Sequence, residues 1–260
     1  MKPNPILERC LKGETVYGTM IQDVRTPAIG QIMAAAGMDL LFFDMEHGPF
    51  DLGVIADMVK VTRLTTCTPF VRVPNDEYHL MARVLDAGAR GIMIPRIETK
   101  QQVEDIICNT HYPPVGVRGC SADKGHNDFE SQNMWTFTEQ ANEENMIILQ
   151  IEREKAIQDI DDLLSVEGVD AAILGPNDLA LSMGVRDKDY LTALEPAIQT
   201  VLDSAKRHNI PCGIHIGNLD WLIEWDKRGM QIIMYANDIV FLRNGAATGI
   251  NKIKEAVKAS

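Results

Sequence analysis

Hydrophobic residues along the chain form short runs that alternate with segments of helical spacing. Apolar runs that end abruptly in polar side chains predict strands buried on both faces. Between them, apolar positions recur with helical periodicity, as at Leu52, Ile55 and Val59, and predict amphipathic helices. Eight strands are expected, at Val16–Ile21, Asp39–Phe43, Pro69–Val73, Gly91–Pro95, Met146–Glu152, Asp170–Leu174, Cys212–Ile216 and Gln231–Ala236.

A helix is expected after each strand. Regular alternation over 260 residues predicts an α/β fold, a (β/α)₈ TIM barrel formed by residues 1–260 as a single domain. A doubly wound open sheet is the alternative, although no G-x-G-x-x-G follows the first strand. The expected helices are Pro27–Gly37, Leu52–Arg63, Asp76–Ala87, Gln101–Cys108, Ala156–Leu164, Leu191–His208, Leu219–Arg228 and Asn244–Ala259, with a further helical segment, Trp135–Asn145, before the fifth strand.

Charge and composition argue against several classes of function. A formal net charge of -12 and a pI near 4.9, without clustered Lys and Arg, argue against a nucleic-acid surface. The five cysteines contain no C-x-x-C pair, which indicates reduced thiols and neither a disulfide framework nor a zinc knuckle. No apolar signal segment or membrane-length run is present, so we expect a cytoplasmic protein that does not engage membranes.

Two neighbouring strand ends carry the strongest chemical signal. Gln150 and Glu152 lie on one face at the end of the fifth strand, and Asp178 follows the Gly175–Pro176 turn after the sixth. If the strands are parallel neighbours, Glu152 and Asp178 meet, and two carboxylates repel unless a proton or a cation lies between them. Such an oxygen-rich site favours Mg²⁺ or Mn²⁺. The alternative is that both acids are solvated loop residues.

The second and third strands also end in polar residues. Asp44 and Glu46 alternate onto one face, and His47 lies beyond them, where it could act as a base or pack against the following turn. Arg72 is a cation inside the apolar strand P-F-V-R-V-P. Such a charge must either be held for an anionic ligand or form an ion pair with Asp44 or Glu46.

Other candidates carry weaker signals. The long loop His111–Asn133 is interpreted as an active-site loop, and its Arg118 could clamp a carboxylate or be solvated. His215, in the seventh strand, is either a lumen-facing site residue or a core histidine. Asp86, in D-A-G-A-R, would normally belong to a solvated helix face. The strands contain no lysine for a Schiff base, and only Lys124, on the loop, is not excluded by position.

Several motifs occur together in an order that is specific to one family. They are F-D-M-E-H-G-P, V-R-V-P, V-L-D-A-G-A-R-G-I-M-I-P, Y-P-P-V-G-V-R-G, L-Q-I-E and V-E-G-V-D-A-A-I-L-G-P-N-D-L-A-L-S-M-G. Over most of its length the chain resembles the HpcH/HpaI family of metal-dependent pyruvate aldolases. The resemblance implies reversible cleavage of a 2-keto-3-deoxy or 4-hydroxy-2-oxo acid to pyruvate and an aldehyde, by way of an enolate.

The resemblance also implies roles for individual residues. Glu152 and Asp178 would hold a divalent ion, Mg²⁺, Mn²⁺ or Co²⁺, and His47 would be the base, oriented by Asp86. Arg72 would stabilise the enolate oxygen. The barrels would associate as trimers or hexamers. The expected substrate-binding residues are Gln150, Gly175, Pro176, Asn177, Arg118 and His215.

Three segments depart from the family's usual pattern. They are S-A-D-K-G-H-N-D-F after G-V-R-G, His215 in the seventh strand, and a last strand without a glycine-containing turn. All three fall where the aldehyde is expected, so the pyruvate chemistry is better supported than the second substrate. Two other functions stay open: a lyase acting on a CoA thioester, as in citrate and malyl lyases, and a metabolite-binding barrel without catalytic activity.

Overall fold

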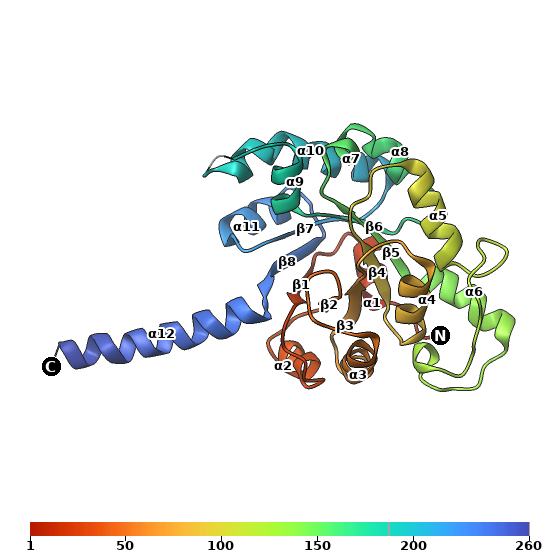
Figure 1. Cartoon of the computed structure of the whole chain (residues 1–260), viewed down its shortest axis with the longest axis horizontal. Helices are drawn as coiled ribbons and strands as arrows, with labels where there is room; N and C mark the ends of the chain where they lie inside the picture. The colour runs from red at the N-terminus through yellow and green to blue at the C-terminus, as the bar shows by residue number, and fades with distance from the viewer. Residues whose placement is uncertain (187, 260) are drawn as a thin grey trace.

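The computed structural model describes residues 1–186 and 188–259, and its parallel strands form a closed barrel surrounded by helices (Figure 1). Each strand pairs with the next along the chain, and β8 pairs with β1. Closure excludes the open sheet and confirms the predicted (β/α)₈ architecture. The strands are β1 (Val16–Ile21), β2 (Leu40–Asp44), β3 (Thr68–Arg72), β4 (Gly91–Ile94), β5 (Met146–Ile151), β6 (Ala171–Leu174), β7 (Cys212–Ile216) and β8 (Ile232–Asn237).

Helices form the outer layer, and several begin at a side chain that caps the first turn. Asp51, for example, accepts a hydrogen bond from Val54 N at 2.9 Å. The described helices are α1 (Pro5–Leu11), α2 (Ile29–Ala35), α3 (Leu52–Thr62), α4 (Tyr78–Asp86), α5 (Lys100–Thr110), α6 (Met134–Glu144), α7 (Glu154–Gln158), α8 (Ile160–Leu164), α9 (Pro176–Ser182), α10 (Tyr190–His208), α11 (Leu219–Lys227) and α12 (Asp238–Lys258), with a 3₁₀ turn at Gly125–Asn127.

The helices differ from the prediction in four places. α1 and α9 were not expected, and the predicted helix Ala156–Leu164 is divided at Asp159 into α7 and α8. α12 starts before the expected Asn244, because Asn237 caps it by accepting a hydrogen bond from Val240 N at 3.0 Å. The rest of α12 extends away from the barrel (Figure 1). Within the described residues, no helix combines the length and apolar character needed to cross a bilayer.

Strand alternation divides the core into two layers. Side chains that face outward pack against the helices in one large cluster, which includes Leu41, Phe43 and Val71. Their neighbours face the lumen and fill it, so the barrel has a packed interior. The lumen cluster contains Val16, Met20, Leu40, Phe42, Phe70, Met93, Met146, Ile148, Ala171, Ile173, Ile232 and Met234.

The loop 111–133 lies at the amino ends of the strands. It follows α5, and a barrel helix returns the chain from the carboxyl ends of the strands to their amino ends. Its contacts agree: Arg63, after α3, forms an ion pair with Asp128 at 2.8 Å, and Gly125 packs against the backbone of Ala87 after α4. The expectation that this loop shares a face with the strand-end acids of its own chain is therefore wrong.

Candidate active site

Polar side chains replace apolar ones where the lumen-facing positions reach the carboxyl ends of the strands. In β2, Leu40 and Phe42 belong to the lumen cluster and Asp44 follows them on the same face. The polar residue is fixed in place because the apolar side chains below it fill the lumen. The lumen-facing positions of β3, β5 and β7 end in the same way, at Arg72, Gln150 and His215.

Arg72 and Asp44 form a buried, two-pronged ion pair. Arg72 Nε lies 2.9 Å from Asp44 Oδ1, and Nη2 lies 2.6 Å from Oδ2. Burial opposes ionisation of Asp44, but the hydrogen bonds and charge of Arg72 outweigh it and lower the pKa of the carboxyl below its usual value. Arg72 Nη1 lies 3.2 Å from Glu46 Oε2 and 3.4 Å from Gln150 Oε1. The guanidinium therefore connects β2 with β5.

Glu46 and Arg96 extend this network toward the mouth of the barrel. Glu46 is paired with both Arg72 and Arg96. Arg96 follows β4 in a left-handed backbone conformation, with φ of 55°, and its backbone N donates to Glu152 Oε1 at 2.8 Å. His47 is the exposed member, with 59% of its side chain accessible and Nε2 3.9 Å from Glu46 Oε2. A base at this position can exchange protons with both solvent and a bound substrate.

Glu152 is buried, and among residues 1–186 and 188–259 it forms no ion pair with a cation. Gln150 Nε2 donates to Glu152 Oε2, and the only other described hydrogen-bond donor to this carboxylate is Arg96 N. Burial raises the pKa of Glu152 to about 7, and Asp178 and Glu46 act in the same direction, against the hydrogen bond from Arg96. Asp178, which follows β6, is therefore near enough to Glu152 for its charge to disfavour ionisation of that carboxyl.

Gly175 permits this close approach of the two strand ends. A Cβ at residue 175 would lie 2.9 Å from both Gln150 Nε2 and Glu152 Oε2. Pro176 then occupies the first turn of α9, which places Asp178 in that turn and leaves Asn177 exposed. Asn177 Oδ1 accepts a hydrogen bond from Tyr190 Oη at 2.6 Å. The short helix α9 therefore carries Asp178 in its first turn, directly after the end of β6.

His215 faces the lumen near the ion pair. Its neighbours Ile214 and Ile216 belong to the outer cluster, so strand alternation points His215 inward. Its ring Nε2 lies 2.8 Å from Ala236 O. Burial lowers the pKa of His215, and the positive charge of Arg72 acts in the same direction. The Ala236 carbonyl and the negative charge of Asp44 oppose this shift. His215 thus borders the site in surroundings that disfavour its protonation.

Asp86 and Arg118 lie elsewhere in the chain. Asp86 ends α4, at the amino ends of the strands, and Arg118 Nη2 lies 2.7 Å from its Oδ1. His126 Nδ1 lies 3.7 Å from the same oxygen. No contact between Asp86 and His47 occurs among residues 1–186 and 188–259. Asp86 and Arg118 therefore contact each other, at the opposite end of the barrel from the strand-end site residues of their own chain.

Two residues of the site were missed by sequence reasoning. Gln22 follows β1 and donates from Nε2 to Asp44 Oδ2 at 2.9 Å. Arg96 follows I-M-I-P in the way that Arg72 follows P-F-V, and a cation at a strand end was the available signal for both. Gln22 offered no such signal, because a glutamine after a strand is common.

The donor set suits a hard divalent ion only in part. Among residues 1–186 and 188–259, no three or more His, Cys, Asp or Glu side chains are arranged to hold a metal ion. Glu152 and Asp178 supply two carboxylates. Mg²⁺ commonly takes one or two protein carboxylates and completes its coordination with water and substrate oxygens. The residues present therefore fit a metal that a chelating substrate helps to hold.

A closed parallel barrel with acids, an arginine and a histidine at the carboxyl ends of its strands is a TIM-barrel enzyme architecture. Residues 22–243 match the model of the family described as HpcH/HpaI aldolase/citrate lyase. The chain belongs to this family, which confirms the resemblance found in the sequence and the expectation of a carbon–carbon lyase.

Individual relatives agree with this assignment. The chain is 33% identical over 211 residues to a hydroxypyruvate/pyruvate aldolase of Agrobacterium fabrum, covering 81% of this chain and 77% of the relative. It is 32% identical over 188 residues to a 5-keto-4-deoxy-D-glucarate aldolase of Escherichia coli, covering 72% and 73%. The crystal structure of an HpcH/HpaI aldolase from Desulfitobacterium hafniense superposes with a TM-score of 0.90 at 31% identity, covering 95% of this chain and 96% of the other.

Proposed function

We propose that this protein is a divalent-metal-dependent aldolase that reversibly cleaves a 2-keto-3-deoxy or 4-hydroxy-2-oxo acid to pyruvate and an aldehyde. The observation that carries the proposal is the pair Glu152 and Asp178 beside the Arg72 guanidinium at the strand ends. An anionic 2-oxo acid meets there both a cation and an acidic pair that can hold a metal. The printed names of two relatives, a hydroxypyruvate/pyruvate aldolase and a 5-keto-4-deoxy-D-glucarate aldolase, fit this chemistry.

Glu152 and Asp178 would hold the ion, Mg²⁺, Mn²⁺ or Co²⁺, which when bound acts as a Lewis acid on the keto group of the substrate. Arg72 donates hydrogen bonds to the oxygen that becomes negative as the enolate forms. Gln150, held between Arg72 and Glu152, contacts the substrate carboxylate. Because Asp44 fixes the guanidinium by two hydrogen bonds, little reorganisation is needed at the moment of reaction.

His47 is proposed as the group that moves the proton. In the condensation direction it takes a methyl proton from pyruvate, directly or through water, and in cleavage it returns that proton. Glu46, 3.9 Å from His47 Nε2, is placed to orient the ring within one chain. The proposed role of Asp86 in orienting His47, and that of Arg118 in binding substrate, require a second copy of the chain.

The proposed homo-oligomer rests on α12. Its exposed apolar side chains recur at helical spacing along one face, at Ile239, Leu242, Ile250, Ile253 and Val257. At the base of α12 an apolar groove of about 270 Å³ is lined by residues of α2 and by Phe241. We propose that α12 of one copy packs on another copy, in a trimer or hexamer. We also propose that the protein is cytoplasmic.

Steady-state condensation with and without metal tests the proposal. After chelation and dialysis, activity toward pyruvate plus a panel of aldehydes should vanish and return on addition of Mn²⁺, Mg²⁺ or Co²⁺. Asp178→Asn should weaken metal binding in a calorimetric titration, whereas Asp105→Asn, on the exposed side of α5, should not. Full activity in metal-free protein, or trapping of pyruvate by borohydride, would replace the metal mechanism with a Schiff base.

A further inference from the structure

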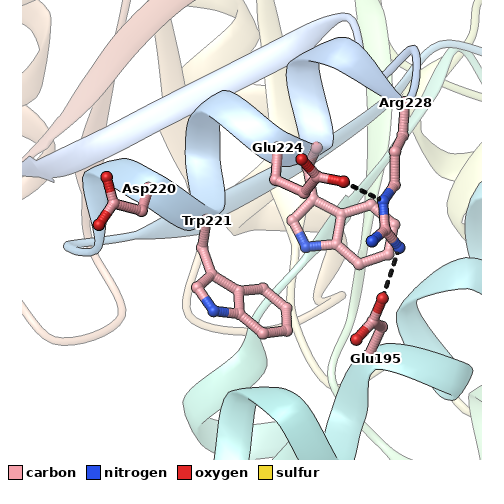
Figure 2. Close-up of a pocket in the computed structure, with 6 residues that line it drawn as sticks. Glu195, Asp220, Trp221, Glu224 and Arg228 are labelled. Carbon is pink, nitrogen blue, oxygen red and sulfur yellow. Dashed lines mark hydrogen bonds and ion pairs between the residues drawn. The ribbon is translucent and has the colours of Figure 1, made fainter.

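The pockets outside the strand-end site differ in how far their charges are already paired. A pocket of about 270 Å³ lies between α10 and α11 (Figure 2). Its arginine, Arg228, forms ion pairs with Glu195 at 2.7 Å and Glu224 at 2.9 Å. The same guanidinium lies 4.6 Å from the centroid of the Trp225 ring. This pocket supplies its own counter-charges and leaves its cation fully engaged.

A second pocket, of about 390 Å³, is lined by several cationic side chains and lies at the opposite end of the barrel from Glu152. It is lined by Lys2, Arg63 and Arg90, with Asp128 as the one carboxylate among its lining residues. This local excess of positive charge occurs in a chain of net charge -12. The three cations come from separate parts of the fold: the N-terminal segment, the end of α3 and the start of β4.

Asp128 is shared by two of these cations. It lies 2.8 Å from Arg63 Nη2 and 2.9 Å from Lys2 Nζ. Arg90 therefore takes no part in this pair of contacts. Thr66 and Thr68 also line the pocket.

Arg90 is the least compensated cation of the pocket. Only 4% of the residue is exposed, and its nearest described carboxylate, Glu144, lies 3.7 Å away. Its Nη2 donates to Lys2 O at 2.6 Å, whereas Nη1 has no hydrogen-bond partner among residues 1–186 and 188–259. Burial, followed by the charge of Arg63, lowers the pKa of Arg90 to about 10. A buried guanidinium with an unused donor is costly unless an anion compensates it.

We propose that this pocket is an anion site for a small phosphate group, separate from the strand-end site. Two guanidiniums and an ammonium, against one lining carboxylate, match a doubly charged oxyanion. Thr66 and Thr68, which line the same pocket, carry hydroxyls that can serve as further donors. A phosphate bound there would connect the N-terminal segment to α3 and β4 and so stabilise the folded chain.

Inorganic phosphate is the probe, in a calorimetric titration and in thermal unfolding at constant ionic strength. Phosphate should bind and raise the unfolding midpoint. Lys2→Gln, a change at a side chain that is 70% exposed, should weaken binding about fivefold. Arg90→Gln should weaken it at least about tenfold. Lys60→Gln, on an exposed part of α3, and Arg72→Lys, at the strand-end site, should leave phosphate affinity unchanged.

Each outcome decides the proposal. If Arg90→Gln does not fold, Lys2→Gln alone gives the answer. Equal affinity in Lys2→Gln and wild type, or no phosphate binding at millimolar concentration, overturns the proposal. Loss of binding in Arg72→Lys assigns the anion to the strand-end site instead. Glycerol phosphate and malonate, titrated in parallel, separate a phosphate-ester site from a dicarboxylate site, and stronger binding of malonate than of either phosphate contradicts the assignment.

Discussion

Replacing Arg72 separates catalysis from structure, because the same guanidinium serves both. Arg72→Ala and Asp44→Asn each break the buried pair that now holds Nε and Nη2 at 2.9 and 2.6 Å. Removing one partner of such a pair typically costs about 3–5 kcal/mol of folding free energy. Both variants should therefore unfold at lower denaturant concentration than wild type, by similar amounts. Only Arg72→Ala also removes the donor that we assign to the enolate oxygen.

The two variants should differ in rate per folded molecule. Loss of an oxyanion donor lowers turnover by about 10²–10³, or about 2.7–4 kcal/mol of transition-state stabilisation. Arg72→Ala should show this loss in the exchange of pyruvate methyl protons with deuterated solvent, a reaction that needs no aldehyde. Asp44→Asn keeps the guanidinium and should lose much less. The folded fraction of each variant, measured by circular dichroism, normalises both rates.

One result would refute this reasoning. If Arg72→Ala exchanges protons at the same rate per folded molecule as Asp44→Asn, the guanidinium serves only to neutralise Asp44 and Glu46. Arg72→Lys tests whether charge alone is sufficient, because lysine keeps a positive charge but lacks the planar guanidinium. A lysine variant with unchanged exchange would show that charge alone is sufficient.

Three further predictions concern other residues. Gly175→Ala should weaken Mn²⁺ binding by about 10–100-fold in calorimetry by displacing Glu152, whereas Gly217→Ala, where an added Cβ meets nothing within 4 Å, should not. The pKa of the buried His126 is lowered to about 4 by burial, against the charge of Asp86, so the unfolded chain binds more protons between pH 4 and 6.5. The free energy of unfolding, measured with urea, should fall by up to about 3 kcal/mol as the pH drops through that window. This pH dependence should disappear in His126→Gln and persist in His79→Gln, a change at an exposed histidine. His215→Leu should change the ratio of kcat/KM among aldehydes and leave pyruvate proton exchange intact, and abolished exchange would place His215 in the catalytic set.

Local patterns were sufficient to predict the strands and helices, but not to exclude an open sheet. Each buried strand contains residues that face the lumen and residues that face the helices, so it reads as a continuous apolar run. Eight such runs separated by helices favour a barrel, and the pairing of β8 with β1 established its closure. Ala156–Leu164 shows what periodicity cannot predict. Its apolar spacing continues across Asp159, whose backbone leaves the helical region at ψ of 16°.

The strand-end residues were predictable because strand direction alone brings them together. Asp44, Arg72, Gln150 and Glu152 each follow an apolar run, and parallel pairing places all such positions at one end of the barrel. The loop 111–133 was assigned to the wrong end of the barrel because its position in the order of elements was overlooked. Its length and its arginine suggested function, but its place after a helix, which sends it to the amino ends, carried the decisive information.

The filled lumen also has a consequence for the order of events in catalysis. Phe42 and Phe70 stack beneath the polar residues with their ring centroids 5.2 Å apart, so the site has a floor and opens toward the carboxyl ends of the strands. A molecule seated against Arg72 can leave only after whatever lies above it has departed. The aldehyde should therefore be the first product released and pyruvate the last. Product inhibition by pyruvate should then be competitive with the 2-oxo acid, whereas inhibition by the aldehyde should be noncompetitive.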